Sequence, residues 1–393
     1  MSGETPDTRQ DRRPACLLKR TQPGIGDAVN KIKVNLDKKI SASYEIYIGR
    51  EILDRIGMII AKNELASRYV VITDSNVSDL YGKRFLRALS DMGIQADMIE
   101  FPAGEASKNV DVMLDIIKRL LGMGVDRRSA LIALGGGVAG DLTGFVASTY
   151  MRGIPYIQVP TTLLAQVDSS IGGKTGIDLS AGKNLLGSFY QPKGVFIDLS
   201  FLRTLPTREF NNGMAEIVKY GIIEDTELFS LLEDEAKTIR NESMVLLETV
   251  IGRSCRIKKS IVETDEKESG LRRILNFGHT IGHAIEAESG YSLSHGEAVS
   301  IGMAAAAMIS EKLKYLPSRD MERIRKLAEA LGLPCGIPES LSTEGILSRL
   351  KTDKKKHGDA INFVLLKKLG SSFVSSEAPE EMIRETINML KGR

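Results

Sequence analysis

Histidine is scarce in this chain, and most of its histidines fall in one segment. Of the 4 histidines in 393 residues, His279, His283 and His295 lie within LNFGHTIGHAIEAESGYSLSHGEA. Histidine is the commonest metal ligand in proteins. The i, i+4 spacing of His279 and His283 puts both rings on one face of a helix, and His295 follows a turn-like stretch from which it could reach that face. The spacing indicates a metal site, although HxxxH without a neighbouring Glu is a weak motif and buried core histidines would also fit it.

A glycine-rich turn in the first half of the chain has the spacing of a dinucleotide site. Gly135, Gly137 and Gly140 form GxGxxG after the apolar run ALIAL and before the helix-compatible run LTGFVAS. Glycines there let backbone N–H groups approach a pyrophosphate at a helix N-terminus. The alternative is a tight turn that binds nothing. No acidic residue ends a strand about 20 residues later, as the usual fingerprint requires, so Asp74 at the end of RYVVITD is the candidate ribose or adenine contact.

The segment 151–192 gathers charged and polar side chains among glycines. In GGKT and AGKN, glycine lets a loop close on an anion while lysine supplies the charge. GGKT is not a Walker A motif, because Asp168 occupies the position of the required glycine. We therefore expect a loop that clamps a phosphate or carboxylate, with a solvated basic loop as the alternative. The candidate residues are Arg152, Thr161, Thr162, Asp168, Lys174, Lys183 and Asn184.

Strand and helix patterns divide the chain into two halves. Strand-like runs at 44–49, 68–74, 96–101, 129–137, 156–160 and 194–199 alternate with helical patterns such as 78–92 and 109–123. This alternation predicts an α/β, Rossmann-like domain with a parallel sheet. Helical patterns then dominate at 208–235, 241–262, 274–288, 296–313, 320–331 and 377–391, with one strand-like run at 360–366. We expect an α/β domain over 32–205, a mostly helical domain over 206–393, and a site in the cleft between them.

Composition argues against several classes of protein. The 53 Lys and Arg residues nearly balance 51 Asp and Glu residues, and the net charge of +2 makes no global case for nucleic acid or an anionic membrane. The three cysteines are scattered and form no CxxC, so we expect reduced thiols in a cytoplasmic protein. No stretch approaches the roughly 18 apolar residues of a membrane span.

Residues 1–31 are polar and carry none of these motifs. They lack the apolar core of a signal peptide and contain the acids that transit peptides avoid, so we expect a disordered extension. A chain that starts near Lys31 should keep its fold and most of its activity. Activity and solubility of the truncated chain test this expectation. A large loss of either would mean that the extension packs on the rest of the protein or completes an interface.

Six motifs together resemble the 3-dehydroquinate synthase family. In chain order they are GGGVAGDLTGFVAS, RGIPYIQVPTTLLAQVDSSIGGKTGID, GKNLLGSFYQP, NGMAEIVKYG, DEKESGLRRILNFGHTIGHAIE and SHGEAVSIGM. The resemblance extends from about Asn35 to the C-terminus. Asp178 stands where many relatives have Asn, a variant that we expect the family to tolerate. The fold group also includes glycerol dehydrogenases and iron-dependent alcohol dehydrogenases, so the fold alone does not settle the chemistry.

The resemblance implies a role for each matched residue. The metal ligands would be Glu216, His279 and His295, which leaves His283 to contact a metal ligand or to face the substrate. Contacts to NAD fall on Asp74, Asn76, Glu105, Lys108, Gly135, Gly136, Gly137, Val138, Asp141, Thr161, Thr162, Phe201 and Thr204, with Lys174 and Lys183 at the boundary with the substrate. Substrate contacts fall on Arg152, Asp168, Lys174, Lys183, Asn184, Lys219, Lys258, Arg272, Asn276, His283 and a lysine of TDKKK, Lys354 or Lys355.

The resemblance also implies a reaction. The substrate would be 3-deoxy-D-arabino-heptulosonate 7-phosphate, and the products 3-dehydroquinate and phosphate. The implied steps are transient oxidation at C5 by a recycled NAD, elimination of phosphate, re-reduction, ring opening and an intramolecular aldol closure. A Glu/His₂ ligand set accepts Zn²⁺ or Co²⁺, and the family implies a homodimer. The substrate carries roughly three negative charges, which suit Arg152, Arg272 and the matched lysines.

Two related activities would use much of the same site. Another sugar-phosphate cyclase, acting on sedoheptulose 7-phosphate or glucose 6-phosphate, would vary around the substrate end that lacks a carboxylate. The presence of Lys258, Arg272, Asn276 and His283 favours the dehydroquinate-forming enzyme. A polyol dehydrogenase dependent on NAD and a metal would not need so many cations, because its substrates are neutral. An inactive binding or regulatory protein would be expected to lose a ligand or a glycine, and none is missing.

Overall fold

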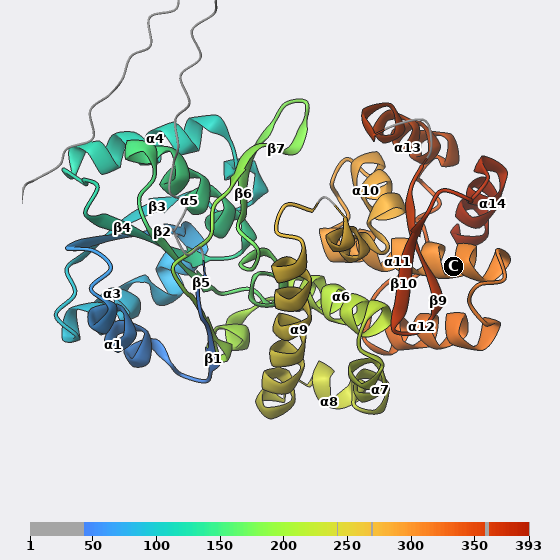
Figure 1. Ribbon diagram of the computed structural model, residues 1–393, viewed down its shortest axis with the longest axis horizontal. Helices are drawn as coiled ribbons and strands as arrows, with labels where there is room; N and C mark the ends of the chain where they lie inside the picture. The colour runs from blue at the N-terminus through green and yellow to red at the C-terminus, as the bar shows by residue number, and fades with distance from the viewer. Residues whose placement is uncertain (1–42, 242, 269, 358–360, 393) are drawn as a thin grey trace, which may run out of the picture. The chain divides into compact units, whose positions relative to one another are not determined.

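The computed structural model describes residues 43–241, 243–268, 270–357 and 361–392, and it describes side chains in the last helix of the third range up to Lys351. The predicted extension 1–31 and the side chains of Lys354 and Lys355 lie outside the described residues. Within the described part, a parallel α/β half is followed by a mostly helical half (Figure 1).

A six-stranded parallel sheet organises the first half. Its strands pair in the order β1-β8-β5-β4-β2-β3. The prediction of a parallel sheet is confirmed. The apolar run 130–134 suits a strand that is buried on both faces. The predicted runs agree with the observed strands to within two residues at each end. The strands are β1 (Ile46–Gly49), β2 (Arg68–Asp74), β3 (Ala96–Phe101), β4 (Ser129–Gly135), β5 (Tyr156–Pro160) and β8 (Val195–Asp198).

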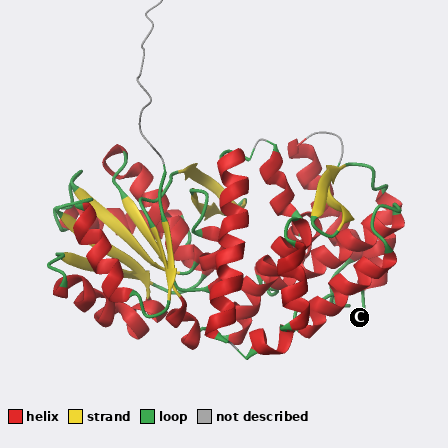
Figure 2. Ribbon diagram, turned by 60° about the horizontal axis from the view of Figure 1, so that its bottom comes forward, coloured by secondary structure: helices red, strands yellow, loops and turns green. Residues whose placement is uncertain are grey.

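Helices lie on both sides of this sheet (Figure 2). Successive side chains of a strand point to opposite faces, so Val71 of β2 packs in one apolar cluster and Val70 in another. The first cluster includes residues of α1 and α3, and the second includes residues of α4 and α5. The helices are α1 (Leu53–Asn63), α3 (Lys83–Asp91), α4 (Val110–Gly122) and α5 (Gly137–Thr149). The result is a three-layer α/β/α arrangement.

The glycine-flanked lysines lie on a β-hairpin, so the expectation of a loop over GGKT and AGKN is wrong. β6 (Lys174–Leu179) pairs antiparallel with β7 (Gly182–Phe189). Gly176 and Gly187 face each other across the pair, and a Cβ on Gly176 would come within 2.8 Å of the Leu186 carbonyl oxygen. Glycine therefore serves close strand approach here. The consequence is that Lys174 and Lys183 project from paired strands.

The second half is built around one buried helix, α11. Every residue of α11 from Ala298 to Ser310 is buried, which explains its alanine-rich sequence. A short antiparallel pair, β9 (Phe363–Lys368) and β10 (Ser371–Ser375), packs beside it. None of the described helices has the length and apolar character needed to cross a membrane. The helices are α6 (Thr207–Ile223), α7 (Thr226–Asp234), α8 (Ala236–Arg240), α9 (Met244–Thr264), α10 (His279–Glu288), α11 (His295–Lys312), α12 (Ser318–Ala330), α13 (Thr343–His357) and α14 (Glu380–Leu390).

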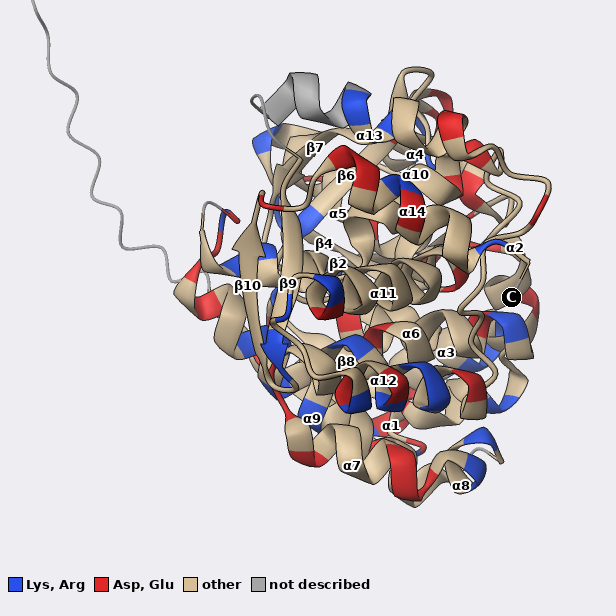
Figure 3. Cartoon of the chain, turned by 90° about the vertical axis from the view of Figure 1, so that its right-hand side faces the viewer, with Lys and Arg blue, Asp and Glu red and all other residues tan. Residues whose placement is uncertain are grey.

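Helix α12 carries its acidic and basic residues mixed along its exposed side (Figure 3). Arg325 pairs with Glu322 at 2.6 Å, and Arg323 pairs with Asp320 at 3.5 Å and with Glu233 of α7 at 2.5 Å. Pairs at i, i+3 spacing stabilise a helix by about 0.2–0.5 kcal/mol each. The local pairing leaves the charge of this helix largely balanced.

Candidate functional site

A cleft of about 1750 Å³ lies between the carboxyl ends of the sheet strands, the β6–β7 hairpin and helices α6, α9, α10 and α11. Most of the residues predicted from the sequence line it. From the sheet half these are Asp74, Asn76, Glu105, Lys108, Gly136, Gly137, Val138, Asp141, Thr161, Thr162, Asp168, Lys174, Lys183, Asn184, Phe201 and Thr204. From the helical half they are Lys219, Lys258, Arg272, Asn276, His279, His283 and His295.

The glycine turn lies where the order of the sheet reverses. From β2 the chain passes to β3 on one side, while β4 returns to the other side of β2 and leads on to β5. Ligands of open α/β sheets bind at the carboxyl ends of the strands at such a point. Asp74 ends β2 and Gly135 ends β4, and a Cβ on Gly135 would lie 3.3 Å from Oδ2 of Asp74. The two predicted dinucleotide contacts are therefore neighbours.

Helix α5 begins at this turn without a side-chain cap. Gly136 occupies the N-cap position, so no side chain accepts a hydrogen bond from the first N–H groups of the helix. A Cβ on Gly136 would meet Cγ2 of Thr162 at 2.9 Å, which explains the need for glycine. An uncapped helix N-terminus presents free donors and positive potential to an anion. The turn can therefore hold a phosphate of a dinucleotide.

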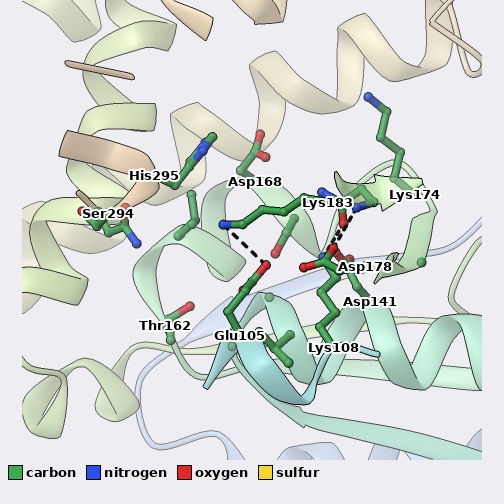
Figure 4. A pocket seen from close by; sticks show the side chains of 18 of the residues that line it. Glu105, Lys108, Asp141, Thr162, Asp168, Lys174, Asp178, Lys183, Ser294 and His295 are labelled. Atoms are coloured by element: carbon green, nitrogen blue, oxygen red, sulfur yellow. Dashed lines mark hydrogen bonds and ion pairs between the residues drawn. The ribbon is translucent and has the colours of Figure 1, made fainter. Parts of the chain in front are cut away.

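A buried lysine connects the floor of the cleft to the hairpin. Lys108 is 4% exposed and donates from Nζ to Asp141 Oδ2 at 2.6 Å and to Asn184 Oδ1 at 2.5 Å. Burial raises the pKa of Asp141, and Lys108 opposes that shift. Figure 4 shows Lys108 and Asp141 together below the hairpin, with Lys183 extending toward Glu105. Because Asn184 has a positive φ of 56°, its backbone is fixed in a conformation that asparagine tolerates well.

Glu216, His279 and His295 come together although they lie on three different helices. Glycines allow the helices to approach closely. A Cβ on Gly296 of α11 would come within 2.6 Å of Asn212 Cα on α6, and one on Gly282 of α10 would meet the Ala298 carbonyl oxygen of α11 at 3.0 Å. A capping box between Ser294 and Glu297 fixes the start of α11, and therefore the position of His295 as its first residue.

The donor set fits a divalent ion. Glu216 is fully buried, and among the described residues neither of its carboxylate oxygens accepts a hydrogen bond. Its Oε1 lies 3.4 Å from Nε2 of His279 and 3.4 Å from Nε2 of His295. Ligand atoms about 2.0–2.1 Å from a shared tetrahedral ion lie about 3.4 Å apart. Lys219 on the same helix forms an ion pair with Glu216, and its positive charge partly offsets the cost of burying this carboxylate.

The other ring nitrogens of the two histidines have partners that fix their orientation. Nδ1 of His279 lies 3.2 Å from the Phe277 carbonyl oxygen, and Nδ1 of His295 lies 3.6 Å from Glu286 Oε2. Partners of this kind leave Nε2 free to bind a metal. Burial and the nearby Lys219 hold the pKa of His279 well below its usual range. The His279 ring is therefore neutral near pH 7. Although burial lowers the pKa of His295, Glu216 and Glu286 raise it to about 9, so a metal would have to displace a proton from that ring.

His283 belongs to the same cluster of rings but occupies a different position. Its ring centroid lies 5.2 Å from that of His279 and 6.0 Å from that of His295, and the side chain is exposed to the cleft. The HxxxH spacing correctly put His279 and His283 on one helix face. The carboxylate nearest to the Nε2 atoms of His279 and His295 nevertheless comes from α6, which the spacing could not reveal.

The cationic side chains of the cleft are held by acidic or carbonyl partners. Lys258 donates to Asp168 Oδ1 at 2.6 Å, and Tyr220 donates to the same oxygen at 2.6 Å. Burial alone would raise the pKa of Asp168, but Lys258, Lys219 and Tyr220 outweigh it and hold that pKa well below its usual range. Lys174 forms an ion pair with Glu268, and the Arg272 guanidinium donates to the Glu266 carbonyl oxygen at 2.5 Å.

The acidic partners of these cations were not predicted from the sequence. Glu268 forms an ion pair with Lys174 and accepts a hydrogen bond from Asn276 Nδ2 at 3.0 Å. Glu286 forms an ion pair with Lys183 at 2.7 Å. Although burial would raise the pKa of Glu286, contacts with His295 and Lys183 lower it to about 2. Helical spacing was an available signal, because Glu286 follows His283 by three positions on α10 and so shares its face.

Three of the predicted residues whose side chains the structure describes do not line the cleft. Gly135 ends β4 where the turn begins, and Glu216 is fully buried beside the histidines. Arg152 is exposed on a short 3₁₀ turn with a φ of 68°, so the chain does not bring it to its own cleft. The remaining candidate, a lysine at 354 or 355, lies beyond the described side chains.

The chain matches the family model described as 3-dehydroquinate synthase N-terminal over residues 98–212 and the model described as 3-dehydroquinate synthase C-terminal over residues 213–356. It is 45% identical over 350 residues to the 3-dehydroquinate synthase of Desulforamulus reducens, which covers 89% of this chain and 97% of the relative.

Solved structures share the fold. A 2-epi-5-epi-valiolone synthase from Streptomyces hygroscopicus subsp. jinggangensis, with NAD⁺ and Zn²⁺ bound, superposes with a TM-score of 0.84 at 27% identity and covers 91% of this chain and 99% of its own. A 2-deoxy-scyllo-inosose synthase complexed with carbaglucose-6-phosphate, NAD⁺ and Co²⁺ gives a TM-score of 0.77 at 29% identity, covering 88% and 96%.

Proposed function

The chain belongs to the 3-dehydroquinate synthase family, and on that premise we propose that it converts 3-deoxy-D-arabino-heptulosonate 7-phosphate to 3-dehydroquinate and phosphate. The observation that carries this proposal is the composition of a single cleft. It combines a glycine turn at the switch point of the sheet, a Glu/His₂ cluster and a set of lysines and arginine. A neutral polyol has no negative charge for those cations to bind, whereas a phosphorylated sugar acid has a phosphate and a carboxylate.

We assign a dinucleotide and a divalent ion to the two ends of the cleft. Asp74 and the turn from Gly135 to Val138 would hold NAD, and Glu216, His279 and His295 would hold Zn²⁺ or Co²⁺. The neighbours with NAD⁺ and Zn²⁺ or Co²⁺ bound support this assignment. When bound, NAD supplies a hydride acceptor and donor, and the metal supplies a Lewis acid for a substrate hydroxyl.

The protein's own residues bind and orient the substrate. We assign Lys174, Lys183 and Arg272 to its phosphate and carboxylate, because all three line the cleft and bear charge. Asp168 stays ionised and is held by Lys258, so it can accept a hydrogen bond from a substrate hydroxyl. The substrate phosphate itself serves as the base for its own elimination in this proposal. Catalysis then rests mainly on orientation and charge stabilisation.

We place the domain boundary at 205–206, between the 3₁₀ turn Leu199–Thr204 and the start of α6 at Thr207. Phe201 and Thr204 of that turn line the cleft. The segment joining the two halves would therefore also contribute to the cofactor site, and we infer that substrate charge draws the halves together around it. A homodimer is the oligomeric state that the family resemblance supports.

A panel of three sugar phosphates tests the choice of substrate. The heptulosonate 7-phosphate, sedoheptulose 7-phosphate and glucose 6-phosphate are each incubated with the protein, NAD and Zn²⁺ or Co²⁺, and phosphate and carbocyclic product are measured. We expect efficient turnover of the heptulosonate alone, because Arg272, Asn276 and Lys258 suit a substrate that bears a carboxylate. Preferential turnover of either sugar phosphate that lacks a carboxylate would reassign the chain to another cyclase activity.

A further inference from the structure

Glu286 stands between two parts of the site. It lies on α10, and its side chain is only 7% exposed. Its two carboxylate oxygens have different partners, because Oε2 lies 3.6 Å from Nδ1 of His295 and Oε1 lies 2.7 Å from Nζ of Lys183. One carboxylate therefore contacts both a residue of the metal cluster and a lysine of the β6–β7 hairpin.

The contact with His295 is on the side of the ring away from Glu216. Nε2 of His295 faces Glu216 Oε1 at 3.4 Å, so Nδ1 is left to face Glu286. A carboxylate that accepts the Nδ1–H of a metal-binding histidine fixes its tautomer and orientation, and it makes Nε2 a better donor to the metal. At 3.6 Å the contact of Glu286 with His295 is an ion-pair distance, so a small approach would make Glu286 the acceptor of this N–H. His279 has a backbone carbonyl in the corresponding position.

The contact with Lys183 reaches across the cleft. Lys183 extends from β7 in the sheet half to α10 in the helical half, and its Nζ also lies 3.8 Å from Glu105 and 4.5 Å from the centre of the Tyr291 ring. An anionic substrate that binds Lys183 must compete with Glu286 for the ammonium group. Once Lys183 binds the substrate, the Glu286 carboxylate would contact only His295.

We propose that Glu286 is a positioning residue that orients the metal ligand His295 and holds Lys183 until an anionic substrate takes this lysine. The proposal rests on the proposed function in that the substrate is anionic and His295 binds the metal. Because binding free energies at two sites are linked reciprocally, the substrate should tighten metal binding and the metal should tighten substrate binding through Glu286.

Two other roles for Glu286 make different predictions. Glu286 could itself be a ligand, since His283, Glu286 and His295 form a second group with closely spaced donor atoms. It could also act merely as an ion pair that joins the two halves. If Glu286 were a ligand, its substitution would lower the number of metal ions bound per protein. If it were only an ion pair between the halves, substitution of Glu286 and of Lys183 would have the same effect on metal affinity.

The experiment titrates the full-length, metal-stripped protein with Co²⁺ and with Zn²⁺, in the absence of NAD and substrate. Glu286→Gln should weaken metal affinity about 10- to 100-fold, as removal of such partners typically does, and should alter the visible Co²⁺ absorption. Glu288→Gln is the matched control, because Glu288 is on the same helix and pairs with Arg349 at 2.9 Å, away from the cleft. Lys183→Ala should leave metal affinity at least as high as in the wild type.

Three results would overturn the proposal. The first is unchanged metal affinity in Glu286→Gln. The second is a loss of metal affinity in Lys183→Ala equal to that in Glu286→Gln. The third is that Glu286→Gln binds less than one metal ion per protein while Glu216→Gln still binds one. Glu286→Asp, which keeps the charge, should recover part of the affinity and gives a second variant if the glutamine protein folds poorly. Because the titration needs no turnover, its failure is separate from failure of the proposed function, which wild-type product formation tests.

Discussion

Removal of the metal should abolish turnover, and addition of Zn²⁺ or Co²⁺ should restore it. The expectation follows from the buried Glu216 carboxylate, whose Oε1 lies 3.4 Å from Nε2 of both His279 and His295. A catalytic ion with three protein ligands keeps open positions for substrate oxygens. Activity and bound metal are measured together after chelation and after stepwise addition of each ion. Full activity in a protein freed of metal would contradict the assignment.

The same measurement separates ligands from neighbours. Glu216→Ala, His279→Ala and His295→Ala should each lose bound metal and activity. His283→Ala should keep the metal and lose turnover, because His283 faces the cleft beside the cluster. If His283→Ala strips the metal as fully as His279→Ala, the ligand set is wrong.

Lys183→Ala should lower kcat/KM for the sugar phosphate about 10- to 100-fold, the effect of losing one charge-assisted contact. Affinity for NAD should change little, because the Nζ of Lys183 pairs with Glu286 of the helical half at 2.7 Å and lies farther, at 3.8 Å, from Glu105. Substrate kinetics and an NAD titration on the same protein test both statements. Lys193→Ala, an exposed lysine beyond the hairpin, is the matched control.

If Lys183→Ala loses NAD affinity as strongly as it loses kcat/KM, Lys183 does not belong to the substrate region alone. The variant also tests closure of the cleft, since substrate should draw the two halves together less effectively without this charge. Scattering with and without substrate measures that change. Absence of closure in the wild type would refute the closure step and leave the assignment of Lys183 intact.

The sheet could be predicted from the sequence because its strands are buried on both faces and read as apolar runs. The β6–β7 hairpin could not, because its glycines and lysines break the alternation that indicates a strand. Its pairing depends on Gly176 and Gly187, which allow the two backbones to approach. A glycine that serves close packing has the same appearance in a sequence as one that serves a loop.

The cluster of Glu216, His279 and His295 shows a similar limit. Local spacing paired His279 with His283, whereas Glu216 joins His279 and His295 through the close packing of α6 against α11 at Gly296. No local pattern encodes that contact, and the family resemblance alone indicated it. An anionic substrate predicts cations in its site, but it does not predict the carboxylates Glu268 and Glu286 that hold those cations in place.

The central claim is that NAD is recycled in a phosphate-eliminating cyclisation. The most direct measurement counts phosphate released per NAD while NADH absorbance is followed, with the protein, its metal, the heptulosonate 7-phosphate and a small amount of NAD. We expect phosphate and carbocyclic product to exceed the NAD present greatly, while NADH stays near baseline. Accumulation of NADH in proportion to product would identify a net dehydrogenase and contradict the account.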